Sequence, residues 1–377
     1  MERTTRVTKF VGLDVSKRTI AVAVADDGRE HARYLGGVEN TPEKVRHLMH
    51  HLGPAESLLV CYEAGPTGYG LYRQLTKMGI TCVVVAPTLI PQRAGDRVKT
   101  DRRDAVRLAE LLRAGELTPV WVPGVEDEAL RDLVRAREDA KMDQLRARHR
   151  LSKFLLRHDL HPPGKMRPWS GVHRAWLDSL DLKGPAGVVL AEYLHTLDEI
   201  GARITRLEQA IHEAAQTSSR APVIQALQAL RGVKEVTAAT LVAEVGEFSR
   251  FRHPRQLMAY SGLVPREYSS GAGRWQGGIT KAGNAHLRRV VVEAAWAYRH
   301  RPALKGDLRR RQEGQSAAVT DIAWRAQVRL HRKYMRLVMR GKGGGVAAAA
   351  VARELLGFVW AVATEVEAHQ RQEHRVA

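Results

Sequence analysis

Cysteine is nearly absent from this sequence, since Cys61 and Cys82 are the only two among 377 residues. So few cysteines exclude the disulfide framework that small secreted domains use. Both lie inside apolar, strand-like runs, so we expect two reduced and buried thiols. The opening residues, MERTTRVTKF, also lack the apolar block of a signal peptide. We therefore expect a cytoplasmic protein.

Acidic residues are scarce as well: 41 Asp and Glu face 60 Lys and Arg, which gives a formal net charge of +19. This imbalance argues against an enzyme of small neutral metabolites and indicates a polyanionic partner. No apolar stretch reaches the roughly 18 to 20 residues that span a bilayer, so we expect no membrane partner. With 44% hydrophobic residues, the chain has enough apolar side chains for two or three folded domains.

The first 122 residues alternate short β-branched runs with helical patterns. Three strands are predicted at 7–15, 19–26 and 31–39, followed by a helix at 42–53, a strand at 57–65, a helix at 69–79, a strand at 81–87 and a helix from 99. This order predicts an α/β domain with a mixed sheet of the RNase H and RuvC type at 1–122.

The rest of the sequence predicts mostly α-helical middle and C-terminal domains. In the middle region, 123–220, a charged helix from 126 to about 160 and another from about 190 to 215 flank the break HPPGKMRPWSG. They suggest an antiparallel hairpin, which could be a coiled coil for dimerisation. In the C-terminal region, 221–377, LQALRGVKEVTAATLVAEVG resembles a helix-hairpin-helix element, and a basic helix near 321–340 precedes a final apolar helix.

Four acids fall at informative places on this predicted scaffold. Asp14 and Glu63 end strands, and Asp101 and Asp104 open the helix KTDRRDAVRLAELL, on the face of its apolar stripe. Neighbouring carboxylates repel by roughly 4 kcal/mol at 4 Å and an effective dielectric of 20, so a cation must compensate. Oxygen ligands of this kind suit Mg²⁺, or Mn²⁺, and a two-metal site can catalyse phosphodiester displacement.

Each acid also has a plainer structural reading. Asp101 and Asp104 fit a helix N-cap and a first-turn charge, and Asp14 could shape a hairpin turn. Glu63 is harder to explain in this way, because a carboxylate that directly follows the apolar LLVC costs energy unless it is paired. Taken jointly, the four positions favour a metal site.

A second informative stretch is YSSGAGRWQGGITKAGNAHLRR. Ser269 and Ser270 lie in a predicted glycine-rich loop with cationic neighbours, a setting that can hold a phosphate against a hydroxyl, although a plain polar turn would look similar. Asn284 begins a basic helix that suits docking on a nucleic-acid backbone. We assign nucleic-acid contacts to Lys17, Lys99, Arg102, Arg266, Arg274, Lys281, Asn284, Arg288 and Arg289.

These motifs together resemble the DEDD transposases of insertion-sequence family 110, which are bridge-RNA-guided recombinases. The resemblance rests on GLDVSK, YEAGPTGYG, KTDRRDA, SSGAG and GGITKAGNAHLRR, which occur in the order of that family over more than half of the chain. Each motif alone is short, but their joint order is specific.

The resemblance implies a RuvC-like domain, a coiled-coil region and a C-terminal transposase domain. In that family's pattern, Asp14, Glu63, Asp101 and Asp104 are the metal ligands and Ser270 is the nucleophile, with Ser269 as the competing assignment. It further implies double-stranded donor and target DNA, a structured guide (bridge) RNA that carries the sequence specificity, and a dimer that forms a tetramer in synapsis. Such a protein would be bacterial and associated with the nucleoid.

Three other classes compete with this interpretation. A hydrolytic RuvC-like nuclease, such as a junction resolvase, would share the four acids but would not need Ser270. A sugar-kinase or actin-like ATPase would explain GLDVSKRTIAVAV, but the sequence lacks its second phosphate hairpin and its adenosine motif. A protein that only binds nucleic acid would tolerate the loss of Asp14.

Overall fold

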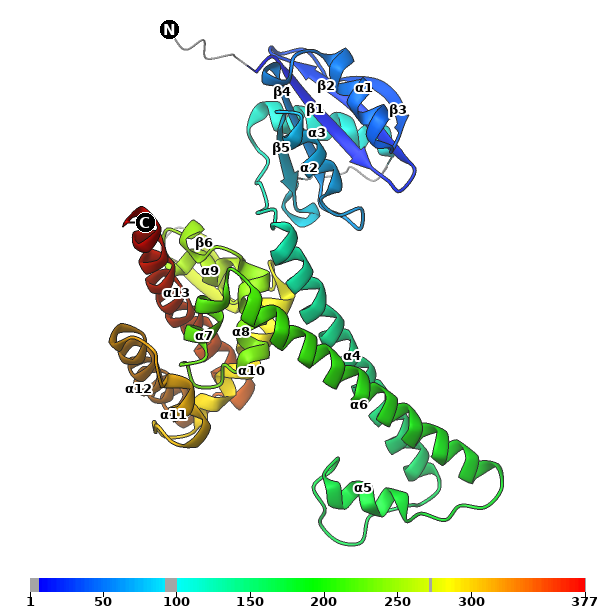
Figure 1. Ribbon diagram of the computed structural model, residues 1–377, viewed down its shortest axis with the longest axis vertical. Helices are drawn as coiled ribbons and strands as arrows, with labels where there is room; N and C mark the ends of the chain where they lie inside the picture. The colour runs from blue at the N-terminus through cyan, green and yellow to red at the C-terminus, as the bar shows by residue number, and fades with distance from the viewer. Residues whose placement is uncertain (1–6, 92–99, 271–272, 377) are drawn as a thin grey trace. The chain divides into compact units, whose positions relative to one another are not determined.

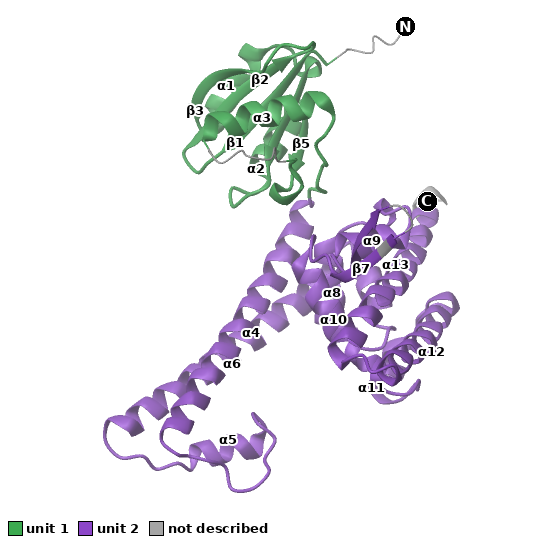
Figure 2. Cartoon of the chain, turned by 180° about the vertical axis from the view of Figure 1, so that it is seen from behind, with its two compact units in different colours: residues 1–122 green, residues 123–377 purple. Residues whose placement is uncertain are grey.

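Alternating apolar residues at the start of the chain form a five-stranded sheet in the computed structural model, which describes residues 7–91, 100–270 and 273–376. The chain divides into two compact units, residues 1–122 and 123–377 (Figure 2). The first unit contains β1 (Lys9–Val15), β2 (Thr19–Asp26), β3 (Arg33–Glu39), α1 (Pro42–Leu52), η1 (Ala55–Ser57), β4 (Leu58–Glu63), α2 (Gly70–Lys77), β5 (Thr81–Val85), η2 (Pro87–Leu89) and α3 (Asp101–Ala114).

The sheet is mixed, with strand order β3-β2-β1-β4-β5 (Figure 1). Strand β1 pairs antiparallel with β2 and parallel with β4, and β4 pairs parallel with β5. The succession of strands and helices is the predicted one, and it confirms the RNase H-like arrangement of the N-terminal region. Local signals set the ends of the helices: Thr41 and Thr100 cap α1 and α3, and Gly115 ends α3 in a left-handed conformation.

The two faces of this sheet carry different side chains, because successive residues of a strand point to opposite sides. Val11 and Leu13 face the cluster formed with α1 and α2, which includes Val45, Met49 and Leu75. On the other face, small residues of β2 such as Ala23 pack against Ala105 and Ala109 of α3. Helix α3 therefore covers one face, and α1 and α2 cover the other (Figure 1).

The second unit begins with two long helices that lie side by side (Figure 2). Its elements are α4 (Val125–Arg157), α5 (Gly171–Asp178), α6 (Pro185–Thr217), α7 (Ala221–Leu227), α8 (Glu235–Val245), η3 (Phe248–Arg250), α9 (Pro254–Tyr260), β6 (Pro265–Ser270), β7 (Gly273–Ile279), α10 (Ala285–Ala295), η4 (Trp296–Arg299), α11 (Gly306–Gln312), α12 (Ala317–Met339) and α13 (Gly344–Val376). The long helices α4 and α6 agree with the predicted helical hairpin, whereas α5 follows the predicted break at 161–171 and was not predicted.

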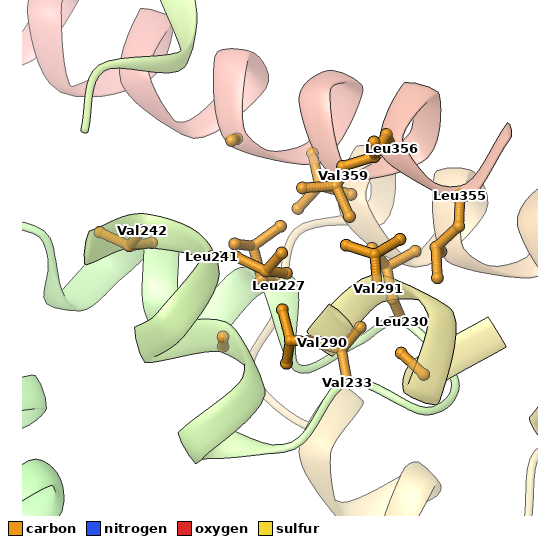
Figure 3. Packing of buried hydrophobic residues seen from close by; sticks show 14 of the residues in the cluster. Leu227, Leu230, Val233, Leu241, Val242, Val290, Val291, Leu355, Leu356 and Val359 are labelled. Atoms are coloured by element: carbon orange, nitrogen blue, oxygen red, sulfur yellow. The ribbon is translucent and has the colours of Figure 1, made fainter. Parts of the chain in front are cut away.

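The base of this helical hairpin shares a core with the C-terminal residues. Leu130 of α4 and Ile211 of α6 belong to the same buried cluster as residues of α7, α8, α10, α12 and α13. Figure 3 shows the centre of the cluster, where Leu227, Val291 and Val359 meet from three different helices. The hairpin is thus anchored in a large apolar core at one end, while α5 and its neighbours form a smaller cluster around Phe154 and Leu177.

Helix α13 corrects one expectation about apolar length. The stretch Gly344–Glu373 is long and apolar enough to cross a membrane by length and composition alone. Half of its most apolar window is buried, and Val351, Leu355 and Val359 are fully buried in the core of the second unit. Such burial is typical of a central core helix, which needs an apolar surface on most sides.

Candidate active site

Two of the predicted acids lie at one edge of the sheet. Residues Leu13 and Tyr62 are register partners on the parallel strands β1 and β4, so Asp14 and Glu63 occupy the next positions along the two strands. Cys61 and Val85 pack against α3, which places Glu63, two residues beyond Cys61 and paired with Val85, on the α3 face. Asp14 lies on this face too, because it is two residues beyond Gly12, and Gly12 faces the backbone of α3. The sheet therefore presents both carboxylates, each partly exposed, on the side of α3.

A close approach between α3 and β1 brings a third acid to this edge. A Cβ atom added at Gly12 would lie 2.3 Å from the carbonyl oxygen of Ala105 and 2.5 Å from the amide nitrogen of Ala109, so only glycine fits there. Asp104 directly precedes Ala105 and is partly buried. Its Oδ2 atom is buried without a hydrogen-bond partner among the described residues.

Substitution of Gly12 tests this packing. We expect Gly12→Ala to lower the free energy of unfolding of the first unit by about 2 to 3 kcal/mol, because the new methyl group would push α3 off the sheet. Urea denaturation followed by far-UV circular dichroism measures the change. Gly70→Ala is the matched control, since nothing lies within 4 Å of a Cβ at Gly70, and its effect should stay below about 0.5 kcal/mol. Equal stability of both variants would contradict the close contact.

Asp101 lies one turn before Asp104 but is exposed. The two residues were expected to point together toward the sheet edge, and in the structure only Asp104 lies beside the buried stripe of Ala105, Leu108 and Ala109. Within residues 7–91, 100–270 and 273–376, no group of three or more carboxylate, imidazole or thiol side chains is arranged to hold one metal ion. The sheet edge thus gathers Asp14, Glu63 and Asp104 on one face without forming a closed ligand set.

The cations predicted near these acids are exposed where the structure describes them. Lys17 lies in the turn between β1 and β2, and Arg102 lies on the first turn of α3 with its guanidinium 5.5 Å from the centre of the Tyr34 ring. Lys99 is outside the described residues. Lys17 and Arg102 can both reach solvent, which a contact with a phosphate backbone requires.

The predicted serine loop is instead a β-hairpin. Ser269 and Ser270 are the last residues of β6, paired with Arg274 and Gly273 of β7, and both serines are exposed. The expectation of a loop was wrong because β6 is exposed almost throughout, so its sequence PREYSS lacks the regular alternation of apolar and polar residues that indicates a strand. Neighbouring strand residues point to opposite faces, so the two hydroxyl groups are not equivalent.

Ser270 shares its face of the hairpin with two exposed aromatic residues. Tyr268 lies two positions before it, and Trp275 is the register partner of Tyr268, with ring centres 5.8 Å apart. Their exposed fractions, 70% and 61%, are large for side chains of this type. The face of Ser270 therefore offers a hydroxyl beside apolar rings, whereas Ser269, the register partner of Arg274, lies on the other face. The side chain of Arg274, which was assigned to nucleic acid, is outside the described part of the structure.

The base of this hairpin is fixed by the loop that follows β7. The Thr280, Lys281 and Asn284 amides donate to the carbonyl oxygens of Val264, Gly262 and Tyr260, at 2.8, 3.1 and 2.8 Å. Gly283 has a φ of 125°, and a Cβ atom there would lie 2.2 Å from the Tyr260 carbonyl oxygen, so glycine is required. These bonds hold Lys281, whose side chain is exposed, next to the foot of the hairpin. Arg266 is also exposed on β6.

Three other residues assigned to nucleic acid make contacts within the protein. Asn284 caps α10, where its Oδ1 accepts a hydrogen bond from the Leu287 amide at 2.9 Å. The Arg288 Nη1 donates to the Ser261 carbonyl oxygen at 2.8 Å. Arg289 forms an ion pair with Glu138 of α4. Because these contacts use part of each side chain, Arg266 and Lys281 are better placed for a phosphate.

The structure adds a buried acid that the sequence interpretation missed. Glu244, at the end of α8, is 1% exposed and accepts hydrogen bonds from Arg135 at 2.8 and 3.0 Å and from Asn284 at 2.7 Å. Burial opposes ionisation, but the hydrogen bonds from Arg135 and Asn284 outweigh it and lower the pKa of Glu244. An ionised Glu244 thus joins α4, α8 and the start of α10.

A second acid, which is partly buried, also connects α4 with α10. Glu138 of α4 contacts His286 Nδ1 at 2.8 Å and Arg289, both on α10. Burial opposes its ionisation, yet the bonds from Arg289 and His286 keep the pKa of Glu138 below its usual range.

Of these two acids, Glu244 had a signal in the sequence, since an acid inside the apolar run TAATLVAEVG needs a partner.

Known protein families match both the segment that contains the four acids and the segment that contains the serine hairpin. A family model described as Transposase matches residues 11–159, and one described as Transposase IS116/IS110/IS902 family matches residues 224–308. The chain is 46% identical to the putative transposase y4qE of Sinorhizobium fredii, over 94% of this chain and 88% of that protein. It is 30% identical to the transposase for insertion sequence element IS1533 of Leptospira borgpetersenii, over 88% of this chain and 97% of that protein. The family model that matches residues 11–159 spans the four acids, and the family model that matches residues 224–308 spans both serines.

Proposed function

Because the chain belongs to the IS110 family of transposases, we propose that it excises and inserts a DNA element by metal-dependent cleavage and rejoining of strands, with a serine as the nucleophile. The two chemical groups come from different units of the chain. Carboxylates of the first unit would hold the metal ions, and the β6–β7 hairpin of the second unit would supply the hydroxyl group.

The residues at the sheet edge fit Mg²⁺ or Mn²⁺. Asp14, Glu63 and Asp104 offer only oxygen donors, which these hard cations prefer, and the Oδ2 of Asp104, which has no hydrogen-bond partner among the described residues, is a buried acceptor that a cation would satisfy. The exposed Asp101, one turn earlier on α3, is the fourth ligand that we propose. When bound, such ions stabilise the attacking and leaving oxygens of a phosphodiester displacement.

The carboxylates are positioned by rigid elements rather than by loops. Asp14 lies on a strand that is paired on both sides, and the contact at Gly12 fixes the first turn of α3 above it. Fixed ligands reduce the reorganisation that is needed when a phosphate binds. Lys17 and Arg102 would contact the backbone on either side of the reacting phosphate.

Ser270 is the nucleophile that we propose. Attack of its Oγ on phosphorus forms a serine–phosphate ester and breaks one backbone ester bond. The released deoxyribose oxygen takes up a proton as the serine hydroxyl loses one. Attack by a hydroxyl end of another strand reverses these steps and joins the DNA. Arg266, Arg274 and Lys281 lie on or next to the hairpin and would hold the phosphate.

The net charge of +19 supports a nucleic-acid partner. We propose that the protein binds donor and target DNA together with a structured guide RNA, and that base pairing supplies most of the sequence specificity. We further propose that it acts as a dimer, with the α4–α6 hairpin as the contact, and as a tetramer in synapsis.

The observation that carries the proposed chemistry is the buried Oδ2 of Asp104, which lacks a hydrogen-bond partner in the part of the chain that the structure describes, at the edge where Asp14 and Glu63 end their strands. Removal of metal is the test. We expect strand cleavage to fall to background in excess chelator and to return with Mg²⁺ or Mn²⁺, whereas DNA binding persists. Cleavage at the full rate in excess chelator would exclude the metal site.

A further inference from the structure

A basic groove lies between α12 and α13, outside both regions that match the transposase family models. Its volume is about 760 Å³. Besides Val328, the side chains from α12 that line it are aromatic or cationic: Trp324, Arg325, Arg329, Arg332, Lys333 and Arg336. Neither the carboxylates of the first unit nor the serine hairpin contributes to this groove, so it is separate from the residues proposed for strand cleavage.

The positive charge of the groove is only partly compensated. Its one acid, Glu354 of α13, pairs with Arg329 at 3.1 Å and Lys333 at 2.6 Å, and Arg325 pairs with Asp321 at 2.9 Å. Arg332 and Arg336 are exposed and form no ion pair within the part of the chain that the structure describes. Cations three and four residues apart on a helix repel one another, so this face is poorly suited to stand alone in water. It fits an anionic partner.

An exposed aromatic residue narrows the choice of partner. Trp324 lines the groove at the N-terminal end of the cationic row and is 47% exposed. A positive groove with an aromatic platform is the usual combination for single-stranded nucleic acid, whose phosphates meet the cations and whose bases stack on the ring. A duplex keeps its bases stacked inside, and an acidic peptide offers no flat ring to cover Trp324.

We propose that the α12–α13 groove binds an unpaired segment of nucleic acid, with a base on Trp324 and phosphates at Arg332 and Arg336. The row from Arg325 to Arg336 extends about 17 Å at 1.5 Å per residue, which suits only a few nucleotides. The segment could be DNA or RNA, because both present the same phosphates and unstacked bases. This inference goes beyond strand cleavage and joining, and it does not depend on the metal site.

Binding of oligonucleotides to the full chain tests the groove. Labelled oligothymidine and oligouridine of about 12 nucleotides, and a DNA duplex of equal length, are titrated in chelator so that binding is separated from cleavage. We expect Trp324→Ala to weaken single-strand binding about tenfold, Trp324→Phe to retain it, and duplex binding to change less than twofold. A preference for one oligonucleotide over the other identifies the natural strand, and either preference supports the groove.

Charge is tested with a matched pair of arginines. Arg336→Ala should weaken single-strand binding severalfold and reduce the slope of log K against log salt by about 0.7, the value for one lost phosphate contact. Arg206, exposed on α6, provides the control, and Arg206→Ala should leave that slope unchanged. Equal effects of the two arginine variants, or competition by polyglutamate or anionic vesicles as strong as that by oligonucleotide, would overturn the proposal. The proposal would also be overturned if Trp324→Ala bound the single-stranded oligonucleotides with the affinity of the wild type.

Discussion

Replacing Asp104 with asparagine is expected to abolish strand cleavage while the protein stays folded. The substitution keeps the size of the side chain but removes the charge of a carboxylate whose Oδ2 is buried and unpartnered among the described residues. A metal ligand worth several kcal/mol in the transition state corresponds to a loss of at least about 10³-fold in rate. The rate at which the variant cleaves DNA that carries the ends of the element measures this loss. We expect Asp14→Asn to lose cleavage to a similar extent.

The stability of the same variant separates a catalytic role from a structural one. A buried carboxylate oxygen that lacks a hydrogen-bond partner among the described residues is unfavourable in the protein alone, so Asp104→Asn should unfold at the same or a higher urea concentration than the wild type. Glu110→Gln is the control for this stability measurement, because Glu110 lies on the same helix but its carboxylate has a partner, His31, at 3.2 Å. A variant at Asp104 that cleaves DNA at the wild-type rate would refute the metal site that we propose.

Ser270→Ala is expected to eliminate the covalent protein–DNA intermediate and, with it, strand joining. Loss of a nucleophilic oxygen leaves no group to form the phosphate ester, so the rate should fall by at least about 10³-fold. Denaturing electrophoresis of reactions with labelled DNA detects the adduct. Ser269→Ala is a closely matched control, since it removes the same atom one residue away on the opposite face of β6.

The outcome also decides between two classes of enzyme. A hydrolytic nuclease of the RuvC type would keep full cleavage in Ser270→Ala and would never form an adduct with DNA. If Ser269→Ala instead removes the adduct and Ser270→Ala does not, the nucleophile is the neighbouring serine and the recombination chemistry stands. An adduct in both single variants would exclude both serines as the required nucleophile.

The first unit was predictable because its sequence patterns are strong and local. Apolar alternation identified the strands, and the parallel pairing of β1 with β4 follows from the order of elements, which places Asp14 beside Glu63. Sequence patterns did not indicate that Asp101 is exposed while Asp104 is partly buried. That difference depends on how α3 docks at Gly12, a contact between positions far apart in the chain.

The second unit was less predictable because its informative contacts join distant segments. Strand β6 is exposed almost throughout, and its sequence lacks the regular alternation of apolar and polar residues that indicates a strand. Helix α5 is short and follows a segment rich in proline and glycine, and its buried residue Leu177 packs in a small cluster with Leu151 and Phe154 of α4 and Leu190 of α6. The buried acid Glu244 finds its partners on α4 and α10, which no local pattern reveals.

The central position of α13 has a consequence for synthesis on the ribosome. Val351, Leu355 and Val359 fill the middle of the second unit, so its core cannot close until the residues beyond 344 have been translated. The first unit has all its strands by residue 122 and can fold earlier. Adding residues 123–344 at about 5 to 20 residues per second takes roughly 10 to 45 s. During that interval a nascent chain carries the carboxylates of the first unit without a folded second unit, so, under the mechanism that we propose, we expect a partly translated protein not to join DNA.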